Sequence, residues 1–299
     1  MMWAVGESGE RVTATPNGRG VCPSCAEPLV AKCGEIICWH WAHRARAGDC
    51  DSWWEPETAW HRSWKLFVPA EQQEVVMPPH RADILGKPKG FAPLVIELQH
   101  SSIAPSTIRE RENFYGRMAW VFDVRDAWEN DRLRFARRDD DLFDDLARVD
   151  GDIADRLSRY GTVEDDRYDY FAWSRARSSI ATCKRYVFFD IGCGGADSYR
   201  VFRVKKFGRR YRWGGWGHWL TLREFCSEWM GVKLPEPGEV AQVILTSAAA
   251  VAIVYDADLR REQVPLALDE GEAIQAIVAA FPGVKLTEVR ERLDSRRTA

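Results

Sequence analysis

Paired cysteines and histidines crowd the first 50 residues of this chain, and they constrain its fold more than any other feature. Five of the eight cysteines lie there. Cys22 and Cys25 form a CxxC pair, and His40 and His43 form an HxxH pair further along. Two thiolates and two imidazoles make a ligand set that tetrahedral zinc prefers. The sequence therefore predicts a structural Zn²⁺ site, with the two histidines converging from one helical turn or a tight loop.

Other interpretations of the same segment stay open. Cys33, Cys38 or Cys50 could replace one of the histidines as a ligand. A second interpretation has no metal and leaves buried free thiols, because free cysteine is among the most buried residue types. A thioredoxin-like redox role is disfavoured because the CxxC pair follows no βαβ pattern.

The pattern after this segment is typical of an α/β core. Apolar and aromatic residues at helical spacing predict a helix over 55–66. Three β-prone runs follow at 74–77, 81–85 and 93–99, separated by proline and glycine turn signals. A second helix and a fourth strand are predicted over 106–124. This order indicates α/β architecture.

Composition sets the expected domain boundaries. Residues 1–50 are too few to build a large apolar core unaided, so this module is expected to need a metal. The α/β core is assigned to residues 51–160, which end in a polar, acidic stretch typical of a linker or a solvated helix. Residues 161–299 are predicted to form a C-terminal α+β region, with strands at 186–191 and 199–204.

Three carboxylates in the predicted core suggest a cation site. Asp83 and Glu97 lie on neighbouring predicted strands, and Glu57 lies on the predicted helix before them. These groups could meet at one end of a small sheet and hold Mg²⁺, a hard cation that prefers oxygen ligands. A metal held in this way can activate water and stabilise a leaving oxygen. Phosphodiester hydrolysis is the natural reaction for such a site.

Three further polar residues complete the candidate catalytic set. Gln99 shares a strand face with Glu97 because strand side chains alternate with period two, and it could orient water or a phosphate oxygen. His61 and Lys65 follow Glu57 at steps of four, which places all three on one helix face. Judged without the strands, they could instead form an exposed face with a Glu-to-Lys charge pattern.

Basic residues supply candidate contacts to nucleic acid. Ser101, Arg109 and Arg111 follow the last acidic strand and could hold phosphates. A second group lies among aromatic residues between positions 199 and 213, where there is no acidic residue. Cations bind the phosphate backbone and aromatic faces stack on unpaired bases, which suits single-stranded DNA. An amphipathic hairpin would give the same alternation. The candidates in this second group are Arg203, Lys205, Lys206, Arg209 and Arg210.

Bulk properties limit the class of protein. The chain has 299 residues, with 42 basic and 45 acidic side chains and a formal net charge of -3. Attraction to DNA must therefore come from local patches. No apolar run approaches the roughly 20 residues that span a bilayer. The first ten residues also lack the pattern of a secretory signal. We expect a cytoplasmic protein without membrane contact.

Together the motifs resemble those of the competence protein CoiA-like family, a branch of the PD-(D/E)XK nucleases that carries an N-terminal zinc-ribbon-like module. The resemblance covers about residues 20–125 of this sequence. In chain order it includes the CxxC and HxxH pairs, Glu57-x3-His61-x3-Lys65, Arg81-Ala82-Asp83, Glu97-Leu98-Gln99, Ser101, Arg109 and Tyr115.

The resemblance implies a restriction-endonuclease-like mixed-sheet core in which Asp83 and Glu97 bind Mg²⁺ or Mn²⁺, assisted by Glu57. Gln99 stands where the wider superfamily usually has lysine. This departure leaves the water-activating group open: Lys65 could supply the missing positive charge, or metal-bound water could react unaided.

The expected activity is metal-dependent hydrolysis of DNA, with DNA uptake, recombination and defence as candidate settings. One alternative is a catalytically silent nucleic-acid-binding adaptor. Another is a zinc-stapled interaction protein whose acidic residues are incidental.

Overall fold

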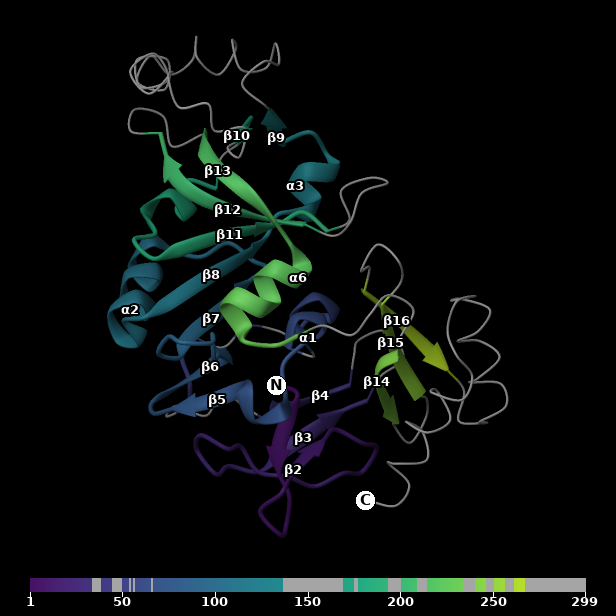
Figure 1. Ribbon diagram of the computed structural model, residues 1–299. Helices are drawn as coiled ribbons and strands as arrows, with labels where there is room; N and C mark the ends of the chain where they lie inside the picture. Colours follow the sequence, from purple (N-terminus) through teal and green to yellow (C-terminus); the bar gives the residue numbers. More distant parts are fainter. Residues whose placement is uncertain are drawn as a thin grey trace. The chain divides into compact units, whose positions relative to one another are not determined.

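The computed structural model describes thirteen stretches of the chain and divides it into two compact units (Figure 1). One unit comprises Met1–Gly86 and Met230–Ala299, and the other comprises Lys87–Trp229. The described residues are 1–33, 39–44, 50–53, 55, 57–65, 67–136, 169–174, 177–192, 200–208, 214–233, 240–245, 250–255 and 261–266.

The first unit begins with two small antiparallel hairpins. Strand β1 (Trp3–Val5) pairs with β2 (Arg11–Thr13), and β3 (Leu29–Lys32) pairs with β4 (His40–His43). The core beneath them is small, as expected for a module that needs a further stabilising element. Its buried members are Met1, Ala4, Ala14, Cys22, Leu29 and Trp41.

A short helix and a hairpin follow in the same unit. Helix α1 (Ala59–Lys65) is followed by a 3-10 turn, η1 (Ala70–Gln72), and by β5 (Gln73–Met77), which pairs antiparallel with β6 (His80–Gly86). The predicted helix over 55–66 is thus shorter than expected at its start, and Glu57 precedes it.

Near the C-terminal end of the chain the first unit has a three-stranded antiparallel sheet. Its strands are β14 (Val240–Leu245), β15 (Ala250–Tyr255) and β16 (Arg261–Leu266), in that order.

The second unit contains a large mixed sheet, with strand order β7-β8-β11-β12-β13-β10-β9 (Figure 1). Strands β7, β8 and β11 run parallel, and the remaining pairs are antiparallel. Every residue of β7 and β8 is buried, which is typical of parallel strands covered on both faces. The strands are β7 (Leu94–Gln99), β8 (Met118–Asp123), β9 (Leu133–Ala136), β10 (Asp169–Trp173), β11 (Tyr186–Asp190), β12 (Arg200–Phe207) and β13 (Gly214–Thr221).

Helices and helical turns connect these strands or follow the last of them. Helix α2 (Pro105–Tyr115) joins β7 to the parallel strand β8, and it starts with a proline at its first turn, where no backbone donor is lost. It is capped at its C-terminal end by Gly116, whose φ of 66° suits glycine. The other elements are α3 (Arg125–Glu129), the 3-10 turn η2 (Ile180–Thr182), α6 (Leu222–Phe225) and the π-helical turn η3 (Cys226–Met230).

The mixed α/β architecture agrees with the sequence pattern, whereas the unit boundaries differ from the expected ones. A boundary near residue 160 does not separate two units, because β11 pairs with β8 and β10 pairs with β9. The buried strand β8 needs a neighbour on each side, and β11 supplies the second one. The acidic stretch over 138–168 lies outside the described residues. None of the described helices is long and apolar enough to cross a membrane.

Candidate metal centre and acidic clusters

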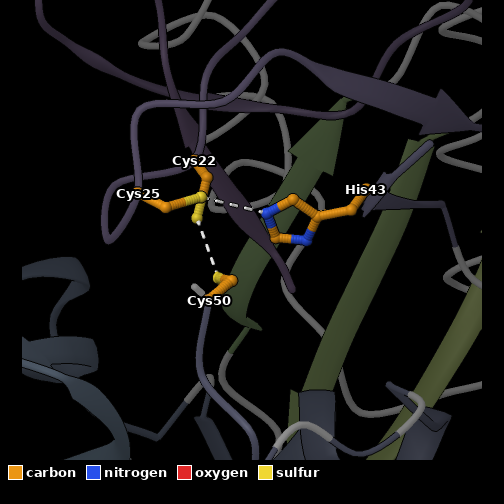
Figure 2. Close-up of side chains that lie close together, drawn as sticks. All are labelled: Cys22, Cys25, His43 and Cys50. Atoms are coloured by element: carbon orange, nitrogen blue, oxygen red, sulfur yellow. Dashed lines mark hydrogen bonds between the residues drawn. The ribbon is translucent and has the colours of Figure 1, made fainter. Parts of the chain in front are cut away.

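Four side chains in the first unit converge on one point (Figure 2). The ligand atoms of Cys22, Cys25, His43 and Cys50 all lie within 4.8 Å of one another. Cys22 Sγ is 3.8 Å from Cys50 Sγ, and Cys25 Sγ is 3.4 Å from His43 Nε2. A tetrahedron with zinc–sulfur bonds of about 2.3 Å places two sulfurs about 3.8 Å apart. The cluster could therefore bind a structural metal such as zinc, closed by four protein ligands.

The CxxC turn brings two of these sulfurs to the same side of the chain. The Ala26 amide donates to the Cys22 carbonyl at 2.9 Å, and the Cys22 amide donates to the Glu27 carbonyl at 2.8 Å. Ala26 has a φ of 60°, a left-handed conformation that lets the chain reverse directly after Cys25. The Ser24 amide points at Cys22 Sγ at 3.4 Å. The turn thus places an amide donor where it stabilises negative charge on the sulfur of Cys22.

The pKa shifts favour the metal-binding forms of Cys22 and His43, whereas Cys50 stays protonated without a metal. Burial opposes ionisation of Cys22, but hydrogen bonds from the Cys25 and Ser24 amides outweigh it and lower the pKa of the thiol. Burial and the adjacent Cys22 raise the pKa of Cys50 to about 12. Burial lowers the pKa of His43, which keeps the imidazole neutral. Bound metal requires thiolate and neutral imidazole, so a cation at this point would release the Cys50 proton.

The ligand set differs by one residue from the HxxH prediction: Cys50 takes the place of His40. Residues 40–43 form strand β4 and not a helical turn. Because side chains alternate along a strand, residues three positions apart point to opposite faces. His43 therefore faces the cysteines and His40 does not join them. Cys50 was one of the alternatives that the sequence left open.

A second cluster in the first unit centres on Lys65. Its Nζ lies 2.9 Å from Glu57 Oε2, 3.1 Å from Glu74 Oε1 and 3.1 Å from Asp83 Oδ1. Asp83 has 23% of its side chain exposed, whereas the other three side chains are almost fully buried. Glu57 Oε1 is buried and has no hydrogen-bond partner among the described residues. The sequence-based alternative of an exposed charged helix face is therefore wrong.

Glu74 is the one member of this cluster that was not among the residues predicted from the sequence. Its Oε2 accepts hydrogen bonds from the Met2 amide at 2.9 Å and the Trp3 amide at 3.2 Å. The backbone at Glu74 has a φ of 45°, an uncommon conformation for a non-glycine residue. A charged residue at the start of the predicted β-prone run 74–77 was the signal that could have revealed it.

Charge balance fixes Lys65 as an ammonium group. Burial opposes the charged form, but Glu57, Glu74 and Asp83 together raise the pKa of Lys65. The pKa of Glu74 is lowered, because Lys65 and Arg81 outweigh the effect of burial. Lys65 therefore supplies positive charge to the carboxylates, and it is not suited to accept a proton from water.

His61 is the last of the candidate residues in this unit. The ring is buried, and Nδ1 lies 2.8 Å from Thr58 Oγ1, while Nε2 lies 3.9 Å from a carboxylate oxygen of Glu55. Burial lowers the pKa of His61. This geometry indicates that His61 helps to fix the segment before α1.

In the second unit, Glu97 is buried on β7 and forms an ion pair with Arg111 of α2. Arg111 Nη1 donates to Glu97 Oε2 at 2.8 Å, and both side chains are nearly inaccessible. Arg111 Cζ also lies 5.9 Å from the ring centroid of Trp120. Arg111 was predicted to hold a phosphate, but here its guanidinium pairs with Glu97. Gln99 is fully buried, and its Nε2 donates to the Ser101 carbonyl at 3.1 Å.

The other candidate contacts to nucleic acid fall into three groups. Ser101, Arg109 and Lys205 are exposed. Lys206 is partly buried, and the guanidinium of Arg203 lies over the rings of Tyr186 and Trp229, at 5.2 and 4.9 Å from their centroids. Arg209 and Arg210 lie outside the described residues. Phe202 lies on β12 with Arg203, Lys205 and Lys206, and it is fully buried, as the amphipathic-hairpin alternative requires.

Comparison with known proteins bears on the cysteine-rich segment. Residues 11–52 match the family model of the competence protein CoiA, N-terminal domain. This CoiA-like segment contains all four candidate metal ligands, and it ends before Glu57. No curated protein and no solved structure matches the chain. The match supports the resemblance to the CoiA-like family for this segment. It does not extend to Glu57, Asp83 or Glu97.

The Lys65 cluster, which follows the CoiA-like segment in the sequence, should make the free energy of unfolding depend on pH. Glu74 has a depressed pKa in the folded protein, so its contribution is complete above its unfolded value of about 4.3 and is lost as the pH falls. Lys65 has a raised pKa, so its contribution is complete below about 10.4 and is lost above it. Urea unfolding between pH 3 and 7 should give a steep acid limb that is flatter in Glu74→Gln. An identical acid limb in the variant would contradict this account.

Proposed function

We propose that this protein is a metal-dependent nuclease that hydrolyses DNA phosphodiester bonds. Asp83 and Glu97 are the proposed ligands of Mg²⁺ or Mn²⁺, with Glu57 assisting. The observation that carries the proposal is the Lys65 cluster, in which three carboxylates share one ammonium group. Buried charge is costly unless it is paired, so keeping three carboxylates together around Lys65, with Arg81 near two of them, needs a functional reason.

The Oε1 atom of Glu57 supports cation binding as the function of this cluster. Glu57 Oε2 is held by Lys65 at 2.9 Å, while Oε1 is buried without a hydrogen-bond partner among the described residues. Hard divalent cations take carboxylate oxygens as ligands, so the fit of this donor set to Mg²⁺ is chemically sound. A bound metal would supply an activated water and stabilise the leaving oxygen.

The residues of the chain would each do a distinct task in this reaction. Lys65 holds Asp83 Oδ1 and Glu57 Oε2 in place and limits their mutual repulsion. Arg111 does the same for Glu97 in the second unit. Asp83 is the most exposed carboxylate of its cluster, which suits a group that meets metal and substrate together.

The CoiA-like segment adds a second line of support. Its family model is named for a competence protein, which fits an action on DNA. Structural zinc in this segment would stabilise the small core around Trp41 and leave catalysis to the acidic residues. DNA uptake, recombination and defence all remain compatible with such an activity.

The proposal is tested by incubating the protein with single- and double-stranded DNA in Mg²⁺ or Mn²⁺. We expect cleavage that stops with EDTA and falls at least about 100-fold in Asp83→Asn and in Glu97→Gln, since a catalytic metal supplies several kcal/mol. Glu71→Gln, which alters an exposed carboxylate near β5, is the matched control and should keep its activity. Undiminished cleavage in both site variants would remove this ligand assignment. DNA binding without hydrolysis under any divalent ion would support the silent adaptor.

A further inference from the structure

Exposed aromatic side chains gather at one edge of the sheet in the second unit. Phe91, Phe114 and Tyr186 are the exposed large hydrophobic residues in the described part of the chain, with 71%, 41% and 45% of their surface accessible. Phe91 lies three residues before β7. Phe114 lies in the last turn of α2, which leads into β8, and Tyr186 is the first residue of β11. All three rings therefore lie where the parallel strands of this unit begin.

The pairing of the parallel strands brings these segments side by side. Val95 of β7 is the register partner of Met118 of β8, and Ala119 of β8 is the partner of Tyr186. The three strands thus start at one edge, beside the end of α2 (Figure 1). Because neighbouring strands lie about 4.8 Å apart, the starts of β7 and β11 are separated by about 10 Å.

Phe91 is carried on an anchored turn. Its amide donates to the Pro88 carbonyl at 3.2 Å, and Gly90 has a φ of 80°, the conformation that a type II turn requires at its third position. Arg117 Nε donates to the Ala92 carbonyl at 3.1 Å and joins this turn to the start of β8. The fold thus holds in place the turn that carries an exposed phenylalanine.

The other two rings also have fixed neighbours. The ring centroid of Tyr186 lies 4.8 Å from that of Trp229 and 5.2 Å from the guanidinium carbon of Arg203. The Phe114 ring meets the Tyr115 ring edge to face at 5.1 Å. Side chains that are ordered before binding lose less conformational entropy when a partner arrives.

Cationic side chains surround the three rings, and each ring has one within three positions in the sequence. Residues 87–96 and 113–119 contain no acidic residue. Glu112 is buried and accepts hydrogen bonds from the backbone amides of Lys184 and Arg185 at 2.9 and 3.1 Å. Exposed carboxylates on the adjoining α2 and η3, those of Glu110 and Glu228, offset only part of the positive charge. The exposed cations are Lys87, Lys89, Arg117, Lys184 and Arg185.

We propose that this edge, with its three aromatic rings and five cations, binds single-stranded DNA. Cations bind the phosphate backbone, and exposed aromatic rings stack on bases. A duplex keeps its base faces stacked inside, so the rings favour an unpaired strand. The choice of DNA rests on the proposed nuclease function. The surface itself is independent of that function, and it contains none of the phosphate contacts predicted from the sequence.

Fluorescence anisotropy of a labelled oligothymidylate of about 16 nucleotides, without added Mg²⁺ or Mn²⁺, measures this binding. Phe91→Ala should weaken binding about fivefold to 100-fold, as loss of one stacked base does, and should keep the salt dependence. Lys87→Gln with Lys89→Gln should weaken binding and make the dependence of log Kd on log salt shallower by about 0.7 per lost phosphate contact. Arg134→Gln changes an exposed cation on β9, at the far end of the strand order, and should alter neither quantity.

The outcomes separate this surface from the nuclease assignment. Wild-type affinity and salt dependence in both site variants would overturn the surface, even if the protein cleaves DNA. Preferential binding of an oligouridylate, or of vesicles of phosphatidylserine and phosphatidylcholine, would also overturn the choice of single-stranded DNA. Weaker binding in both site variants, with no hydrolysis under any divalent ion, would support the surface and remove the nuclease assignment.

Discussion

Cys50→Ser is expected to remove metal from the CoiA-like segment and to unfold the small core around it. The sulfur of Cys50 lies 3.8 Å from that of Cys22 and closes a four-ligand set. Binding of structural zinc contributes about 10–16 kcal/mol in small zinc modules, far more than such a core supplies alone. The zinc content, measured by metal analysis, should fall from about one ion per chain to near zero. Thermal unfolding should begin at a clearly lower temperature.

Two variants serve as controls for this result. Cys33→Ser changes a thiol that packs against the same core but stands outside the cluster, so its metal content should match that of the wild-type protein. His40→Ala should also keep the metal, because His40 is not among the four ligands. Loss of zinc in His40→Ala with retention in Cys50→Ser would restore the original HxxH assignment.

Lys65→Met is expected to destabilise the first unit by about 3–5 kcal/mol. The substitution keeps the length of the side chain but leaves three carboxylates without their shared ammonium group. Removing one partner of a buried ion pair has an effect of this size, because it leaves uncompensated charges in an interior of low dielectric constant. Urea unfolding at pH 7, followed by circular dichroism, measures the change.

Lys32→Met is the matched control, because Lys32 is exposed on β3 of the same unit. It should change the free energy of unfolding by less than about 0.5 kcal/mol, as exposed substitutions usually do. Equal stability of the two variants would show that the carboxylates do not depend on Lys65. Partial recovery of Lys65→Met at pH 4 is expected as well, because protonation removes the unpaired charges.

The sequence predicted the elements with strong periodicity and missed the arrangements that depend on distant segments. Helix α2 and strands β8 and β11 lie within a few residues of their expected bounds, because buried parallel strands are continuously apolar and a proline marks the helix start. The CxxC pair was equally clear, since both sulfurs come from one turn.

The missing parts share a physical cause. Whether His40 or Cys50 completes the metal cluster depends on residues 40–43 being a strand, which the histidine spacing alone does not indicate. Glu74 joins Lys65 through the fold of β5, and the exposed aromatic side chains share one edge through the pairing of β7, β8 and β11. The expected boundary near residue 160 missed the parallel pairing of β8 with β11. Such contacts are set by sheet pairing and not by local pattern.

Counting Mn²⁺ bound to the zinc-loaded protein by equilibrium dialysis tests the central proposal most directly. The wild-type chain should bind at least one Mn²⁺ that is lost in the double variant Asp83→Asn with Glu97→Gln, while both proteins keep their zinc and their fold. The same number of Mn²⁺ ions, bound with the same affinity in both proteins, would contradict the assignment of these carboxylates to a catalytic cation.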